Sequence, residues 1–298
     1  MRDDCRRGSG SSEGPRLEEF CAPGADFEEM RVRVNEHVDI RVVRFTPARD
    51  SGMPAVLFVP GWITIMEAWK EVLVEMTKDF PVIYMETREK SSSRIGRNAQ
   101  ISVTGLGEDV VRTAESFGLQ DRRFLAFGSS LGATVLLDCC NSFRNRPLGL
   151  VLVGPNAAFR VPLVWKAIIF LFYPRSYFLI KPFVKWHLRH FRLNIKVDRG
   201  QYEKYCRNLD AADPWKLKKA AMAFWNYQVW DRLPEIDMPV LILKGAKDKL
   251  HEPEALVRME SMLKKGGSID MGTNKRTHTA EIVELLRKFV RETAAGPG

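Results

Sequence analysis

Residues 124–137 read Phe124-Leu-Ala-Phe-Gly128-Ser129-Ser130-Leu131-Gly132-Ala-Thr-Val-Leu-Leu137, an apolar run, a turn of small residues and a second apolar run. The turn contains the pattern Gly-x-Ser-x-Gly, with Ser130 at its centre and Ser129 at the variable position. Glycines two residues before and after a serine let a strand turn sharply into a helix, which exposes the hydroxyl at a strained position. The free N–H groups of that helix point at the same place. We therefore predict that Ser130 is a nucleophile; the alternative is a glycine turn between two core elements.

The segments around this turn alternate between strand-like and helix-like patterns. Strand-like segments, most of them short continuous apolar runs as in buried parallel strands, occur at 55–59, 81–85, 122–127, 148–153 and 238–245. Helical patterns follow them at 66–79, 103–117, 134–140, 253–264 and 280–292, with a last short strand at 268–271. Before them, residues 29–34 and 38–45 alternate as two antiparallel strands. This order predicts an α/β protein with a mostly parallel central sheet and helices on both faces.

Length and composition set the domain organisation. The chain has 298 residues, 45% of them hydrophobic, which suffices for a large core. We expect a disordered polar tail at 1–22, a sheet domain in two parts at 23–156 and 236–298, and a helical insertion at 157–235. The five cysteines are odd in number and lack metal-ligand spacing, and the first residues lack an apolar secretion signal. These features predict a cytoplasmic protein without a metal site.

A serine nucleophile requires a histidine base and a carboxylate that orients the histidine. Asp248 follows the buried run at 238–245, where ligands gather in parallel sheets, and His278 lies in a loop between the last strand and the last helix. We predict Asp248 and His278 as the acid and the base. His251 is a rival base, and the loop after Val153 is a rival position for the acid, although Asn156 stands there. Asp248 as a helix cap and His278 as a solvated loop residue remain alternatives.

The order Ser130, Asp248, His278 resembles that of the α/β-hydrolase superfamily, from about residue 30 to 290. The resemblance implies that the insertion is a cap domain. It also implies that the loop Phe58-Val-Pro-Gly-Trp62 supplies an oxyanion donor from the Trp62 N–H, with the Leu131 N–H as the second donor. Pro60 replaces the histidine usual in that loop. The segment 86–93 is similar to the family pattern Asp-x-Arg-Gly-x-Gly-x-Ser at its arginine and last serine, but Glu89 and Ser91 replace the glycines.

From these residues we expect a serine hydrolase that cleaves carboxylic esters, with an apolar acyl group, through an acyl-enzyme. No metal or organic cofactor is implied, and the expected partner is a small-molecule acyl ester. The same constellation serves thioester, amide and carbon–carbon hydrolysis and acyl transfer, which therefore stay open. A non-catalytic binding or membrane-peripheral protein that kept the fold is the alternative from another class.

The net charge of +9 is concentrated in the insertion, where residues 157–197 contain eight Lys or Arg and no Asp or Glu. On a helix, Lys181, Lys185, Arg189 and Arg192 form one basic stripe, Pro182 falls in the first turn, and Phe183 and Trp186 face away. One interpretation is a cap that packs its apolar faces on the sheet domain and exposes a basic face to water. The other is contact with an anionic membrane or an acyl substrate. Nucleic acid is not expected, because no binding motif accompanies the charge. A second helix is predicted to begin at Asp213-Pro214.

Overall fold

The computed structural model describes residues 16–159, 161–192, 199–245 and 253–295. A central sheet has the strand order β1-β2-β4-β3-β6-β7-β8-β9, and the short β5 pairs with β2. The hairpin β1–β2 is antiparallel, β2 pairs antiparallel with β4, and the pairs from β4 to β9 are parallel. The strands are β1 Asp26–Asn35, β2 Val38–Thr46, β3 Ala55–Val59, β4 Val82–Glu86, β5 Arg94–Ile95, β6 Phe124–Ser129, β7 Leu150–Val153, β8 Val240–Lys244 and β9 Gly266–Asp270. The predicted sheet is confirmed.

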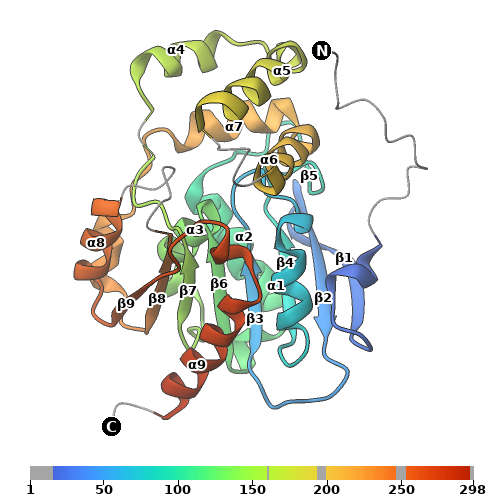
Figure 1. The fold of residues 1–298 in the computed structure, drawn as a ribbon, viewed down its shortest axis with the longest axis vertical. Helices are drawn as coiled ribbons and strands as arrows, with labels where there is room; N and C mark the ends of the chain where they lie inside the picture. The colour runs from blue at the N-terminus through green and yellow to red at the C-terminus, as the bar shows by residue number, and fades with distance from the viewer. Residues whose placement is uncertain (1–15, 160, 193–198, 246–252, 296–298) are drawn as a thin grey trace.

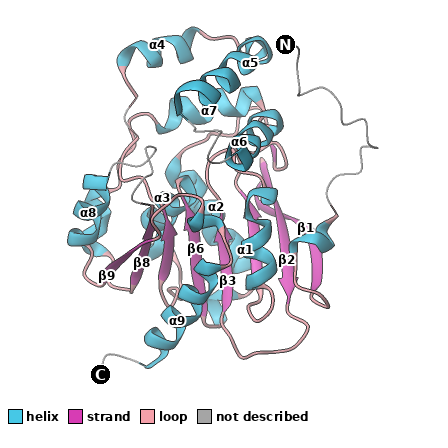
Figure 2. Cartoon of the chain, viewed as in Figure 1, coloured by secondary structure: helices cyan, strands magenta, loops and turns pink. Residues whose placement is uncertain are grey.

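Helices cover both faces of this sheet (Figures 1 and 2). One face packs on α2 Val103–Ser116, α3 Leu131–Cys139 and α8 Pro253–Met262, and the other packs on α1 Lys70–Met76 and α9 Glu281–Ala295. Two apolar cores result, one on each side, and every residue of β3, β4, β6 and β7 is buried. This explains why those strands read as unbroken apolar runs rather than as alternating ones.

The insertion forms a helical cap above the carboxyl ends of the parallel strands (Figure 1). Its helices are α4 Leu163–Leu171, α5 Tyr177–His187, α6 Arg199–Ala211 and α7 Pro214–Phe224, and a π-helical turn at Leu188–Arg192 follows α5. The two connections to the sheet domain lie side by side, because Phe159 N donates to Tyr227 O and Val229 N donates to Ala157 O. As predicted, Asp213 caps α7: its Oδ1 accepts from Trp215 N and Lys216 N.

Two local expectations differ from the structure. Residues Leu17–Phe20, assigned above to the tail, form a 3-10 helix, and the Phe20 ring is buried in the core beside α1. One large apolar side chain is enough to anchor this otherwise polar segment. Helix α5 begins at Tyr177 rather than beside Lys181, so Pro182 lies inside the helix and not in its first turn. Within the described ranges, no helix is long and apolar enough to cross a membrane.

Candidate active site

Ser130 occupies the sharp turn between β6 and α3, as the sequence predicts. Its backbone has φ 48° and ψ −114°, a conformation that side-chain-bearing residues rarely adopt. Such strain persists only where the surrounding structure imposes it, and it is typical of functional positions. The Ser130 N–H donates to Val153 O of the neighbouring strand β7 at 2.8 Å, which fixes the turn to the sheet.

The two glycines of the pattern are required by close packing. A Cβ on Gly128 would lie 2.8 Å from the backbone of Ala133, and a Cβ on Gly132 would lie 2.1 Å from Val59 O. Neither distance is possible for real atoms, so α3 approaches β6 and β3 this closely only because both positions are glycine. The close approach brings the N-terminus of α3, beginning with Leu131, beside the end of β3. Since the first amides of a helix have no intrahelical acceptor, the Leu131 N–H is suited to receive an oxyanion.

The loop after β3 contacts this turn. A Cβ on Gly61 would lie 3.3 Å from both Ser130 Cβ and Ser129 O, which places the adjacent backbone of Trp62 beside the nucleophile candidate. The next residue, Ile63, has φ 52°. This value is an outlier for a β-branched side chain, and together with Ser130 it makes up the positive-φ residues other than glycine in the described chain. The backbone strain is therefore concentrated at the expected oxyanion loop and at the elbow.

The side chain of Lys90 holds the loop after β3 in place. The sequence analysis did not assign this role to Lys90. The side chain is buried, and its Nζ donates to Gly61 O at 2.8 Å and also to Thr64 O. Burial lowers the pKa of Lys90, against the opposing effect of Glu86 and Glu89. From the cap, Asn208 Oδ1 accepts from Ile65 N at 3.3 Å. The loop is thus fixed by one buried cation and one cap residue, where the family has a histidine in the loop itself.

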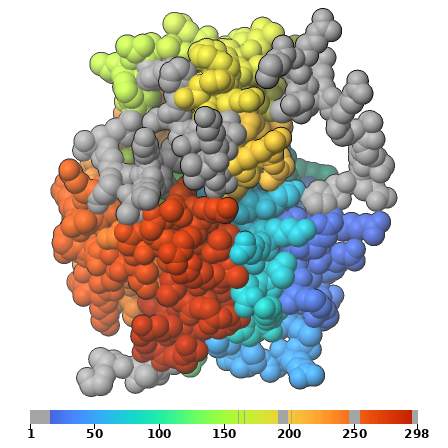
Figure 3. All heavy atoms as spheres, in the orientation of Figure 1, coloured from blue at the N-terminus to red at the C-terminus, as the bar shows by residue number. Residues whose placement is uncertain are grey.

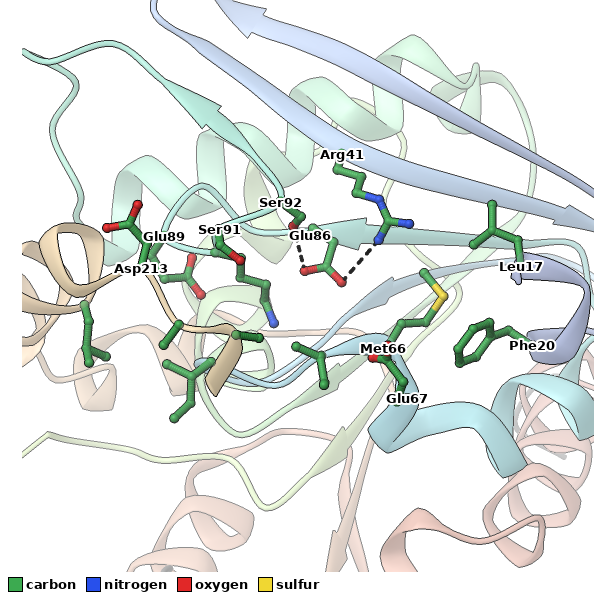
Figure 4. Close-up of a pocket in the computed structure, with 16 residues that line it drawn as sticks. Leu17, Phe20, Arg41, Met66, Glu67, Glu86, Glu89, Ser91, Ser92 and Asp213 are labelled. Carbon is green, nitrogen blue, oxygen red and sulfur yellow. Dashed lines mark hydrogen bonds and ion pairs between the residues drawn. The ribbon is translucent and has the colours of Figure 1, made fainter. Parts of the chain in front are cut away.

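Several side chains of the segment that carries Lys90 form hydrogen bonds or ion pairs. Figure 4 shows Glu86 between Ser92, whose hydroxyl donates to it, and Arg41, whose guanidinium forms an ion pair with it. Arg88 forms a buried two-point ion pair with Asp109 of α2, with N–O distances of 2.5 and 2.6 Å. These contacts connect the segment to α2 and β2, and Lys90 extends from it to Gly61 O.

His278 lies in a 3-10 turn between β9 and α9, as the sequence predicts for its loop. Its ring stacks on the buried ring of Trp69 with centroids 4.3 Å apart. Nδ1 lies 3.1 Å from Asn274 O and 3.1 Å from Thr277 Oγ1. A backbone carbonyl only accepts, so this contact requires the proton on Nδ1 and leaves Nε2 as the basic nitrogen. Asp248 and the rival His251 lie outside the described residues, so their predicted roles stay predictions.

Ser130 and His278 line one cavity of about 1070 Å³ between the sheet domain and α6 of the cap. Trp62, Asn156 and Leu243 line it as well, and Lys204 and Asn208 contribute from α6. The volume is slightly above the range of about 300–1,000 Å³ that is typical of small-molecule sites. The indole nitrogen of Trp62 is buried without a hydrogen-bond partner among the described residues, and the ring packs against Phe224 of α7. The cavity therefore joins the nucleophile candidate, the base candidate and the oxyanion loop in one concave site.

Asn156 is a further residue of this site. Its Nδ2 donates to Ser130 Oγ at 3.1 Å, and its backbone N–H and C=O both contact Thr134 Oγ1 of α3. The sequence analysis considered this position only as a rival site for the acid. An amide cannot take the negative charge that orients a histidine, so the structure gives Asn156 a different part, that of fixing the Ser130 hydroxyl.

Comparisons of sequence find no relative: no protein-family profile matches the chain, and no characterised protein matches it. Solved structures do match. An esterase from Thermogutta terrifontis superposes with a TM-score of 0.72 at 18% identity, over 89% of this chain and 99% of the other. The enol-lactonase from Burkholderia xenovorans gives 0.71 at 15% identity, over 89% and 100%. The N-formylmaleamic acid deformylase from Pseudomonas putida gives 0.62 at 15% identity, over 87% and 100%. The chain therefore has the α/β-hydrolase fold.

Proposed function

We propose that the protein is a serine hydrolase that cleaves carboxylic esters with apolar acyl groups. The observation that carries the proposal is the pairing of Ser130, strained at the elbow, with His278 on the wall of the same cavity. A serine hydroxyl is a poor nucleophile unless a base removes its proton, and these residues supply the nucleophile and the base. The names of the structural neighbours, which include an esterase and an enol-lactonase, support this class of reaction.

The proposed reaction has two halves. Ser130 Oγ attacks the ester carbonyl carbon while His278 takes the hydroxyl proton, and the N–H groups of Trp62 and Leu131 bind the resulting oxyanion. When this intermediate collapses, the C–O bond to the alcohol breaks, and the alcohol leaves with the proton from His278. A water then attacks the acyl-enzyme with His278 as its base, which releases the carboxylic acid and restores Ser130. Asp248 is proposed to orient the imidazole.

The preference for an apolar acyl group is inferred from the cavity beside Ser130. Trp62, Val153 and Leu243 contribute apolar surface there, and the volume of about 1070 Å³ exceeds what a small polar substrate needs. The acidic and basic residues of the cavity wall lie on α1 and the segments flanking it, on the segment before α9 and on α6 of the cap, whereas the strand ends beside Ser130 contribute none. This distribution favours an acyl chain over the elbow with a polar leaving group toward the rim.

A series of p-nitrophenyl esters from acetate to palmitate tests the proposal, with the matching anilides and thioesters for comparison. We expect ester hydrolysis that is best at a medium or long chain, at least about 100-fold above the anilides, and reduced to background by Ser130→Ala. Turnover that is the same in Ser130→Ala as in the wild type would favour a non-catalytic protein. Faster cleavage of anilides or thioesters would assign a different bond.

We also propose a cytoplasmic location. The four cysteines in the described part of the chain, Cys21, Cys139, Cys140 and Cys206, are buried and unpaired. Buried free thiols fit a reducing compartment, where disulfides do not persist. Fractionation of cells that express a tagged full-length chain tests this location, with recovery in the secreted fraction as the contradicting result.

A further inference from the structure

The outer side of the cap is unusually apolar. Of the fourteen large apolar side chains that are exposed among the described residues, eleven lie between Leu163 and Trp186, on α4, α5 and the turn between them. Leu163, Leu171 and Leu179 are 82%, 79% and 83% exposed. We call this surface the outer cap face; it also contains Phe170, Phe178 and Phe183. Single exposed apolar residues are ordinary, but eleven between Leu163 and Trp186 are a concentration typical of an interaction surface.

A cap with a solvated basic face would turn the lysines of α5 toward water and its apolar side toward the protein. The structure has the opposite orientation. Lys181 and Lys185 point inward, where both form ion pairs with Asp210 of α6 at 2.9 and 2.7 Å. The Tyr177 hydroxyl, also on the inner side, donates to Leu209 O at 2.8 Å. Lys181 and Lys185 therefore anchor the helix to α6, and the apolar side faces outward. The prediction of a basic face exposed to water is wrong for these two lysines.

The outer cap face is held in place from beneath. Lys218 of α7 donates through Nζ to Phe170 O and Phe172 O at 2.7 and 2.8 Å, at the end of α4. Tyr173 and Trp215 of α7 contact each other edge to face. In Figure 1, α4 and α5 form the part of the cap farthest from the sheet, with α7 between them and the sheet domain, while α6 lines the cavity. Figure 3 shows the atoms of α4 and α5 at the surface on that side of the molecule. The apolar groups thus form a fixed surface away from the two cores.

Charge decides which occupant fits this surface. Residues 157–197 contain no Asp or Glu, and two arginines are exposed on the same part of the cap: Arg175 in the turn between α4 and α5, and Arg189 directly after α5. An apolar helix face flanked by cations and free of acids is the pattern of segments that lie in the interface of a bilayer with anionic lipids. A second copy of the chain fits poorly, because a two-fold contact of this segment would bring two basic surfaces together without a carboxylate from residues 157–197 between them.

We propose that the outer cap face docks on an anionic lipid bilayer, with Leu179, Phe183 and their neighbours at the boundary between headgroups and acyl chains and with Arg175 and Arg189 among the headgroups. The docking is reversible and does not span the membrane. It is independent of the proposed reaction, because none of these residues lines the cavity that contains Ser130 and His278. The face lies on the cap that roofs that cavity, so docking would hold the roof at the lipid surface.

Sedimentation of the full chain with vesicles tests the proposal, with phosphatidylcholine alone and with 30% phosphatidylserine. We expect the wild type to bind the mixed vesicles at low ionic strength. Its binding to phosphatidylcholine alone should be at least tenfold weaker, and so should the binding of Leu179→Ser/Phe183→Ser to the mixed vesicles. Arg175→Gln/Arg189→Gln should weaken binding at low salt and have little effect at high salt. The matched control is Phe27→Ser/Val257→Ser, which changes two exposed apolar residues outside the face and should bind as the wild type does. Circular dichroism checks that each variant is folded.

Two results would overturn the proposal. One is a lack of discrimination: the wild type and Leu179→Ser/Phe183→Ser sediment equally with the mixed vesicles, or the wild type binds equally to both vesicle types. The other is a dimer of the wild type in light scattering that this double substitution converts to monomer, without vesicle binding by either, which would assign the face to a second copy. Neither result depends on whether Ser130 is catalytic, so failure here leaves the proposed reaction untouched.

Discussion

Replacing Lys90 by methionine should separate the activity of the protein from its stability. Methionine has nearly the shape of lysine but no ammonium group, so the bonds from Nζ to Gly61 O and Thr64 O are lost while the space stays filled. The loop that carries the Trp62 N–H then loses the buried ammonium group that holds its backbone in place. Lys90 contacts no reacting atom, and it is therefore a positioning residue for the proposed oxyanion donor.

The magnitude follows from what one donor contributes. Loss of a single oxyanion donor costs about 100- to 1000-fold in kcat, and a loop that is displaced but still held by Asn208 should lose part of that. We expect kcat to fall by about 10- to 100-fold, which corresponds to about 1.4–2.7 kcal/mol of transition-state stabilisation, with KM changed by less than about threefold.

Stability should respond differently, and its pH dependence gives a second readout. Burial lowers the pKa of Lys90, so the folded chain releases this proton at a lower pH than the unfolded chain does. Between the two pKa values the unfolded chain binds more protons, and the free energy of unfolding therefore rises with pH in that interval. Lys90→Met should lack this rise, and at neutral pH it should be about as stable as the wild type, because the desolvation cost of the ammonium group, which outweighs its attraction to the buried Glu86 and Glu89, is removed together with its hydrogen bonds.

The assay is hydrolysis of the best p-nitrophenyl ester, combined with urea unfolding from neutral pH up to the lysine range. Lys288→Met is the matched control, since Lys288 lies exposed on α9, pairs with Glu292 at the surface and does not line the cavity. A kcat within about twofold of the wild type in folded Lys90→Met would refute the proposal that Lys90 positions the oxyanion loop. A loss of folding in this variant would instead show that Lys90 is needed for stability.

Three further predictions concern the base, the elbow and the buried ion pair. His278→Ala should lower kcat by about 10⁴-fold or more while the protein stays folded, and a loss below about tenfold in steady-state kinetics would exclude His278 as the base. Gly132→Ala should abolish activity, because the new Cβ would overlap Val59 O, whereas Gly267→Ala, with no atom within 4 Å, should behave as the wild type in the same assay. Arg88→Met should lower the free energy of unfolding by about 3–5 kcal/mol, because it leaves the carboxylate of Asp109 buried without its cation. Arg88→Met/Asp109→Leu should recover most of this loss in urea unfolding, and equal stability of the single and double variants would contradict the explanation.

The sheet and its helices could be predicted from the sequence because their signals are local. Buried parallel strands such as Ala55–Val59 read as unbroken apolar runs, and the glycines around Ser130 mark a turn that few other residues allow. Asp213-Pro214 marks the start of α7 in the same way. In each case the residues that give the signal are also the residues that form the element.

The rest depends on contacts between distant segments, which no local pattern contains. The orientation of α5 depends on Asp210, which lies 25 residues beyond Lys185 in the sequence. The sequence therefore predicts the row of basic residues on the helix, but not which side of the cap the lysines face. Lys90 sits in a segment that departs from the family pattern, and only the fold brings its Nζ to Gly61 O. Phe20 anchors a segment whose composition otherwise indicates a tail. Asp248 lies outside the described residues, so its assignment as the acid rests on sequence order alone.

The most direct test of the central claim is labelling by a fluorophosphonate, which forms a covalent bond to a serine only where a base and an oxyanion site activate it. Intact mass measurement should show one adduct on the wild-type chain and none on Ser130→Ala. Ser129→Ala is the sharpest control, since it changes the adjacent serine, and it should keep the adduct. Peptide mapping should then place the modification on Ser130. An adduct on Ser130→Ala equal to that on the wild type, or none on a folded wild type, would contradict the assignment of Ser130 as the nucleophile.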